Sequence, residues 1–291
     1  MRKSKTGRLR LFGTAFVSFG LLSGWVSAGA TVATQSANLP PDSQYVAMGS
    51  SYAAGFLIKP QEPMRSTCGR SLIDYPRLVA AKLHLLLNDV SCGGAVTANA
   101  LDTPQGSAPP QIDAVTANTR LVTMTIGGND VNYVGTAIEC GVSSSTCTAR
   151  ANPAQTDAAF QALPNSLTKL IQAVREKAPS AIIVLVTYPR LVPPTPCRAL
   201  HYTPAAARLV GSMGTRLEQV FVTVAKADHV RLADPYVLGA THGPCAQGTN
   251  KWVAGLVASN GFEYHPTGAG HKEMAHLVEQ ALGLSSEHSV P

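Results

Sequence analysis

The chain has no basic stretch interleaved with aromatic side chains, no Cys-x-x-Cys pair, no internal repeat and no low-complexity tract. The first absence argues against nucleic acid as a partner, because nucleic-acid-binding domains gather lysine and arginine on one surface. The second argues against a structural metal site, since no histidine lies at ligand spacing from a cysteine pair either. Neither a metal ion nor an organic cofactor is expected.

The N-terminus has the pattern of an export signal. Its first ten residues hold five lysines and arginines, an apolar stretch runs from Leu11 to Val26, and small residues follow at Ala28 and Ala30. This order is typical of a secretory signal peptide. The alternative is an uncleaved membrane anchor, but the stretch is shorter than the ~20 residues that span a bilayer. We predict a signal peptide at 1–30 and a protein that is secreted, extracellular or in the cell envelope.

Export also changes the interpretation of the charge. The whole chain carries +6, from 23 basic and 17 acidic residues. Without the five basic residues of the leader, 18 basic residues face 17 acidic ones, which leaves +1. The basic character is therefore mainly a targeting signal. The remainder is expected to be a flexible N-terminus at 31–44 and one domain at 45–285, and we expect a monomer without a stable membrane anchor.

Six cysteines are present, and none lies near the predicted cleavage site, which argues against a lipid-anchored start. An even number in an exported chain favours three disulfides. The residues alone leave the pairing open.

Strand-like and helix-like segments alternate along the domain. Apolar runs predict strands at 45–48, 86–91, 120–126, 181–187 and 229–233, and helical periodicity predicts helices at 73–85, 154–177, 204–226 and 266–282. Alternation with continuous apolar strands indicates a parallel sheet covered by helices on both faces. We therefore expect an α/β fold, a flavodoxin-like three-layer α/β/α sandwich with about five parallel strands. Ligands of such folds bind beyond the carboxyl ends of the strands.

Three short motifs carry residues suited to acyl transfer: Gly49-Ser50-Ser51-Tyr52, Gly127-Gly128-Asn129-Asp130 and Glu263-Tyr264-His265-Pro266. A serine nucleophile needs a base that takes its proton and donors that bind the oxyanion. Ser51 and Asn129 each follow a predicted strand, so both are expected at the same edge of the sheet. The plain alternative for the first motif is an ordinary serine-rich turn. The Gly-x-Ser-x-Gly elbow of α/β-hydrolases is absent, because Ala53 stands where its second glycine belongs.

In this order along the chain, the motifs resemble those of the GDSL esterase/lipase family, also called SGNH hydrolases. The resemblance implies that Ser51 is the nucleophile and His265 the base. The segment Cys92-Gly93-Gly94-Ala95-Val96-Thr97 is similar to the second block of the family. It implies an oxyanion hole made by the backbone N–H groups of Ser51 and Gly94 and by the Asn129 amide.

A secreted actinobacterial branch of this family is more similar still, through Cys68-Gly69-Arg70-Ser71, Tyr75-Pro76, Asp234-Pro235, His242-Gly243 and Cys245. Its cysteines pair in sequence order. The resemblance therefore implies the bridges Cys68–Cys92, Cys140–Cys147 and Cys197–Cys245.

The chain departs from the family pattern at two carboxylates. Ser50 occupies the position of the Asp before the nucleophile, and Phe262 occupies that of the Asp before the catalytic histidine. We expect a main-chain carbonyl, from Phe262 or Glu263, to orient His265 instead, with the Glu263 side chain as the other option. His242 and His271 are expected to be structural or surface residues, and Asp234 is a weaker candidate for a triad acid.

The resulting prediction is a secreted serine esterase or lipase that hydrolyses carboxylic esters through an acyl-enzyme, with a small-molecule or lipid ester as substrate. One rival is a deacetylase of glycans or cell-wall sugars on the same fold. Another is a catalytically inactive envelope-binding protein, which the loss of two family carboxylates favours. Activity across ester chain lengths and labelling by a fluorophosphonate would separate the three. The acyl chain length and the head group do not follow from the sequence.

Overall fold

The structure is a computed structural model, and it describes residues 36–63 and 67–284. The predicted signal peptide at 1–30 and residues 31–35 of the predicted N-terminal segment lie outside the described residues. The described chain begins beside the last helix, where the Ala37 N–H donates to the Leu282 carbonyl at 2.7 Å.

The core of the domain is a sheet of five parallel strands. These are β1 (Gln44–Gly49), β2 (Leu86–Asp89), β3 (Thr119–Thr125), β4 (Ile182–Val186) and β5 (Arg231–Ala233), in the spatial order β2-β1-β3-β4-β5. This order is that of flavodoxin-like folds, so the predicted fold class is confirmed. β1 and β3 lie in the middle, and both carry their chain to the same carboxyl edge.

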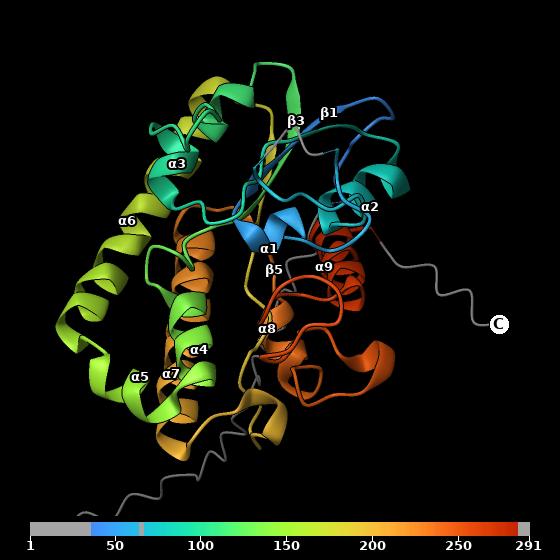
Figure 1. Ribbon diagram of the computed structural model, residues 1–291. Helices are drawn as coiled ribbons and strands as arrows, with labels where there is room; N and C mark the ends of the chain where they lie inside the picture. Colours follow the sequence, from blue (N-terminus) through green and yellow to red (C-terminus); the bar gives the residue numbers. More distant parts are fainter. Residues whose placement is uncertain (1–35, 64–66, 285–291) are drawn as a thin grey trace, which may run out of the picture. The chain divides into compact units, whose positions relative to one another are not determined.

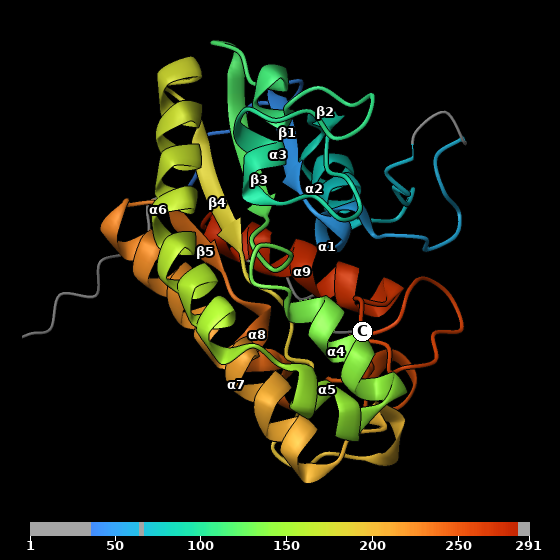
Figure 2. The same cartoon turned by 60° about the vertical axis from the view of Figure 1, so that its left-hand side comes forward.

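Helices cover both faces of the sheet, as Figure 1 and Figure 2 show. The helices are α1 (Ser51–Ala54), α2 (Tyr75–Leu83), α3 (Thr97–Leu101), α4 (Tyr133–Val142), α5 (Ser144–Arg150), α6 (Pro153–Lys177), α7 (Pro204–Ala227), α8 (Pro235–Leu238) and α9 (Gly268–Ala281). Side chains alternate along β1, so that Val46 and Met48 join the apolar core shared with α3, α4, α6 and α7. Tyr45 and Ala47 point to the other face and join the core shared with α2 and α9. The three predicted layers are therefore present.

The helices α2, α6 and α7 begin where the sequence carries a cap and a proline in the first turn. Asp74 accepts from the Arg77 N–H at the start of α2, and Thr203 accepts from the Ala206 N–H at the start of α7. Proline in the first turn costs no hydrogen bond, because the first N–H groups of a helix have no partner within it. The proline-rich segment 189–196 after β4 packs partly against the core, since Leu191 is fully buried and Val192 is 9% exposed.

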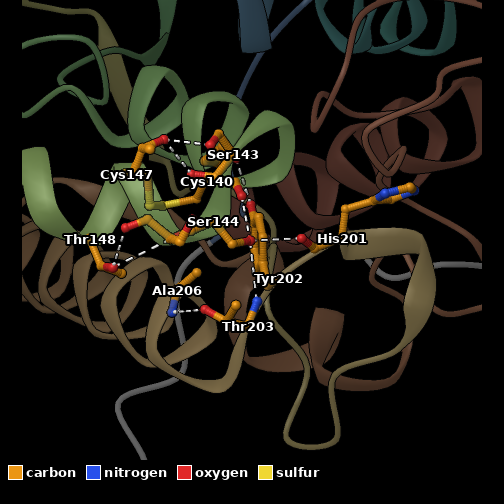
Figure 3. Close-up of a disulfide and its surroundings, with 12 residues drawn as sticks. Cys140, Ser143, Ser144, Cys147, Thr148, His201, Tyr202, Thr203 and Ala206 are labelled. Atoms are coloured by element: carbon orange, nitrogen blue, oxygen red, sulfur yellow. Dashed lines mark hydrogen bonds between the residues drawn. A yellow bond between two sulfur atoms is a disulfide. The ribbon is translucent and has the colours of Figure 1, made fainter.

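Three disulfides are formed: Cys68–Cys92, Cys140–Cys147 and Cys197–Cys245. This pairing in sequence order agrees with the expectation from the resemblance. Figure 3 shows the second bridge, which joins α4 to α5. Beside it, the Ser144 hydroxyl is 2.7 Å from the His201 carbonyl and accepts from the Thr203 N–H at 3.2 Å, so α5 is hydrogen-bonded to the segment where α7 starts.

Candidate active site

Ser51 is the first residue of α1, directly after the central strand β1. The chain can turn there because Gly49 has a φ of +145°, and a side-chain Cβ at that position would lie 2.5 Å from the Thr125 carbonyl oxygen. The Gln111 side chain holds the same glycine from the other side: its Oε1 accepts from the Gly49 N–H at 2.7 Å and its Nε2 donates to the Gly49 carbonyl at 2.9 Å. β3 and Gln111 thus fix the backbone that presents Ser51.

The Ser51 hydroxyl meets a histidine from the other end of the chain. Its Oγ lies 2.7 Å from the Nε2 of His265, and the His265 Nδ1 lies 2.7 Å from the main-chain oxygen of Glu263. A carbonyl can only accept, so the proton of a neutral imidazole sits on Nδ1 and Nε2 is free to accept from the serine. The arrangement is that of a nucleophile, a base and an orienting group.

Both partners are nearly enclosed, with 7% of Ser51 and 4% of His265 exposed. Burial lowers the pKa of His265 to about 4, because the imidazolium loses its hydration, and the hydrogen bond to the Glu263 carbonyl offsets this only in part. The imidazole is therefore neutral at pH 7 and able to take a proton.

Of the two carbonyls expected to orient the ring, that of Glu263 contacts it. The Phe262 carbonyl instead accepts from the backbone N–H of His265, at 3.3 Å. The Phe262 ring stands edge-on to the imidazole, with 5.2 Å between ring centres. At the position where the family pattern has a carboxylate, this chain thus has an apolar aromatic side chain.

The candidate oxyanion donors converge on the same edge of the sheet. The Asn129 Nδ2 donates to the Ala95 carbonyl at 2.9 Å, and the Cys92 N–H donates to the Gly49 carbonyl at 3.0 Å. These bonds hold the segment that contains Gly94 between the two strand ends. The N–H groups of Ser51 and Gly94 have no acceptor among the described residues. Two backbone N–H groups near the Ser51–His265 pair are therefore free to donate hydrogen bonds.

Comparison with known proteins places this geometry in a family. The sequence pattern of the GDSL-like lipase/acylhydrolase family matches residues 47–273, most of the chain. The chain belongs to this family. The predicted reaction class, hydrolysis of carboxylic esters, is thereby confirmed.

Relatives share the full length of the domain. Lipase 2 of Streptomyces coelicolor is 28% identical over 297 residues, which cover 98% of this chain and 98% of that protein. The crystal structure of the extracellular lipase of Streptomyces rimosus superposes with a TM-score of 0.71 at 27% identity, over 82% of this chain and 99% of that one. The crystal structure of phospholipase A1 of Streptomyces albidoflavus superposes with a TM-score of 0.70 at 28% identity, again over 82% of this chain and 99% of that one.

In this GDSL family member, a tyrosine lies beside Ser50, the residue at the position of the first missing carboxylate. The Tyr188 hydroxyl lies 3.2 Å from Ser50 Oγ and accepts from the Gly128 N–H at 2.9 Å. It therefore joins the turn that carries Ser51 to the loop that carries Asn129. Burial raises the pKa of Tyr188 above its usual value, so the hydroxyl stays protonated.

Tyr188 and Gln111 were not predicted from the sequence, because neither stands in a recognisable motif. A signal for Tyr188 existed: it comes just after the predicted strand 181–187, at the carboxyl edge where ligands of this fold bind. Gln111 has no comparable signal, since it starts a short 3-10 helix (Gln111–Ala114) that was not predicted and its partner at Gly49 is distant in sequence.

The other candidates lie outside the site. His271 is buried, and its Nδ1 accepts from the Tyr75 N–H at 3.1 Å. Asp234 accepts from the Thr187 hydroxyl at 2.6 Å and caps α8. His242 stacks on an aromatic ring at 4.0 Å. All three make structural contacts, and among the described residues none of their hydrogen bonds reaches Ser51.

The described part of the chain holds neither a group of metal ligands nor a membrane-spanning helix. Within 36–63 and 67–284, no three histidine, cysteine, aspartate or glutamate side chains are grouped as metal ligands. No helix in that part of the chain has both the length and the apolar character needed to cross a membrane.

Proposed function

We propose that this GDSL hydrolase is a secreted serine esterase or lipase with a Ser51–His265 dyad. The observation that carries the proposal is the 2.7 Å contact between Ser51 Oγ and His265 Nε2, with the far side of the ring held by the Glu263 carbonyl. The three disulfides and the extracellular relative from Streptomyces rimosus support export.

The reaction begins when Ser51 attacks the ester carbonyl and His265 Nε2 takes the hydroxyl proton. The imidazolium then passes this proton to the leaving alcohol, which leaves an acyl-Ser51. A water molecule, deprotonated by the same nitrogen, attacks the acyl carbon and releases the acid. The Glu263 carbonyl accepts from Nδ1–H throughout, so the ring keeps one tautomer and one angle.

Negative charge develops on the carbonyl oxygen at each attack. The N–H groups of Ser51 and Gly94 and the second hydrogen of the Asn129 amide are the donors we assign to it. The first hydrogen of that amide is already used on the Ala95 carbonyl, which orients the group before substrate arrives.

The wall beside the dyad is suited to an apolar acyl group. Phe56 and Phe262 pack edge to face with 5.4 Å between ring centres, and both lie against His265. Gly93 is packed under Phe56, since a Cβ there would lie 2.5 Å from its ring. Aromatic side chains next to the reacting carbonyl offer an apolar surface on which a hydrocarbon acyl chain can be buried.

The direct test is hydrolysis of aryl esters of increasing acyl length, with acetylated sugars in parallel. Ser51→Ala is expected to abolish turnover and labelling by a fluorophosphonate with the fold intact. Ser50→Ala is the matched control, one residue away and equally buried, and should keep labelling. If Ser50→Ala lost turnover and Ser51→Ala kept it, the nucleophile would be misassigned. A preference for acetylated sugars would instead favour a glycan deacetylase.

A further inference from the structure

Tyr264, between Glu263 and His265, has a backbone conformation unusual for its type. Its φ is +53°, in the left-handed region that residues with a Cβ rarely adopt. Such a conformation persists where the surroundings determine it. Its ring is fully buried, stacks on Tyr202 at 5.6 Å, and its hydroxyl donates to the Leu200 carbonyl at 2.7 Å. The side chain is therefore anchored away from the dyad.

The first peptide unit at Tyr264 is hydrogen-bonded at both ends. Its carbonyl, that of Glu263, accepts from His265 Nδ1–H at 2.7 Å. Its N–H, that of Tyr264, donates to the Gly255 carbonyl at 3.1 Å. Hydrogen bonds in a chain polarise one another, so donation at the N–H end strengthens the carbonyl as an acceptor.

The second peptide unit is held in the same way. The backbone N–H of His265 donates to the Phe262 carbonyl, and the Tyr264 carbonyl accepts from the hydroxyl of Tyr52. Tyr52 directly follows Ser51 in α1, and its side chain is fully buried. Two neighbouring residues of α1 thus contact two neighbouring residues of the histidine segment: Ser51 with His265, and Tyr52 with Tyr264.

We propose that Tyr52 is a positioning residue for His265, whose hydroxyl fixes the Tyr264 backbone so that the Glu263 carbonyl stays aimed at Nδ1 in place of the missing carboxylate. The proposal rests on the function proposed above. A carbonyl in a loop can orient an imidazole only if its own peptide plane is fixed. Tyr52 provides that fixation from the element that carries the nucleophile, so the serine and the base move together.

The surroundings of Tyr52 suit this role. Its ring packs between Tyr188 and His265, with 4.6 and 4.7 Å between ring centres. Burial raises the pKa of Tyr52 well above its usual value, so the phenol keeps the proton that it donates. Tyr202, which supports Tyr264 from the other side, is itself held by a 2.9 Å bond from its hydroxyl to the Ala137 carbonyl of α4 and lies near the Cys140–Cys147 bridge (Figure 3).

The test compares Tyr52→Phe with Tyr45→Phe. Each change removes one fully buried hydroxyl and keeps the ring, but the hydroxyl of Tyr45 contacts Thr123 at 2.7 Å inside the sheet, away from His265. Tyr52→Phe should lower kcat by about 10- to 100-fold, because a small misplacement of a catalytic group has effects of this size. The KM of Tyr52→Phe should change less than about twofold, because substrate binding does not depend on the angle of the imidazole. Tyr45→Phe should keep kcat within about threefold, because its hydroxyl does not contact the site.

A second readout does not depend on turnover. Nitrogen-15 NMR of labelled histidine should show His265 as a single Nδ1–H tautomer in the wild type and in Tyr45→Phe, and as a mixture in Tyr52→Phe. Equal kcat and an unchanged tautomer in Tyr52→Phe would overturn the proposal. The proposal can be tested even if Tyr52→Phe does not fold, because it also requires that His265 in the wild type is a single Nδ1–H tautomer held by the Glu263 carbonyl. A mixture of tautomers, or an Nε2–H form, in the wild type would overturn it. Absence of fluorophosphonate labelling in the wild type would instead reject the proposed function.

Discussion

At the scale of single residues, a backbone carbonyl dipole contacts His265 where the family pattern has a charged aspartate. No carboxylate contacts His265 among the described residues, and its Nδ1 is hydrogen-bonded to the neutral Glu263 carbonyl. A carbonyl fixes the tautomer as an aspartate does, but it stabilises the imidazolium less. Burial without a compensating charge is also why the pKa of His265 falls to about 4. The result is a weak base that stays available over a wide range of acidic pH.

This pKa predicts the acid limb of the pH–rate profile. The reaction needs neutral His265, so kcat/KM should hold as the pH falls through 6.5 and decline only as it approaches about 4. The profile of kcat/KM, measured with an uncharged ester, reports the free enzyme. Folding stability should weaken over the same interval, because the unfolded chain binds the proton first, at about pH 6.5. An acid limb centred at or above pH 6.5 would contradict the burial argument.

The oxyanion assignment makes a prediction at Asn129. Asn129→Ala should lower kcat by about 10²–10³, the usual cost of removing one oxyanion donor. It also removes the bond to the Ala95 carbonyl, which should cost roughly 1 kcal/mol of stability. Steady-state kinetics and thermal unfolding separate the two effects. A change confined to KM would make Asn129 a substrate-binding residue instead.

At the scale of elements, the sequence predicts the strands and the longer helices, because their apolar residues recur at a regular spacing. All five strands and the helices α2, α6, α7 and α9 were expected within a few residues of their bounds, because burial of one face imposes a period. β5 begins at Arg231 rather than at 229, since His229 has a φ of +50° and lies in the turn that follows α7. α4 and α5 were not predicted: the segment is rich in Gly, Ser, Thr and Cys, and a disulfide holds it.

The disulfide between Cys68 and Cys92 ties the segment after the nucleophile to the one that carries Gly94. Replacing both cysteines by alanine should cost on the order of 3 kcal/mol, since the bridge closes 24 residues. The bridge between Cys140 and Cys147 closes only 7 residues, so the same replacement there should lower the free energy of unfolding by roughly 2 kcal/mol. Denaturant unfolding of both variants gives the comparison. Activity should fall only in the first, and equal losses of activity would show that the bridge does not support the site.

At the scale of the whole molecule, the order of motifs along the chain predicted more than any single motif. Parallel strands bring residues far apart in sequence to one edge, so Ser51 and Asn129 could be expected together from the strand pattern alone. His265 could not, because it lies in an irregular segment whose path depends on Tyr52 and Tyr264. The acyl chain length could not be predicted from the sequence for a different reason: one scaffold serves many substrates, and the shape of the pocket decides among them.

We propose that the main chain, and not a carboxylate, orients His265, and the decisive measurement is the kcat/KM of Glu263→Gln. This variant keeps the backbone carbonyl and removes the side-chain charge, so the loss should be less than about tenfold, under ~1.4 kcal/mol. His265→Ala, measured beside it, should lose at least about a thousandfold, because only binding and the oxyanion donors remain. A loss in Glu263→Gln as large as that in His265→Ala would show that the Glu263 side chain is the third member of a triad.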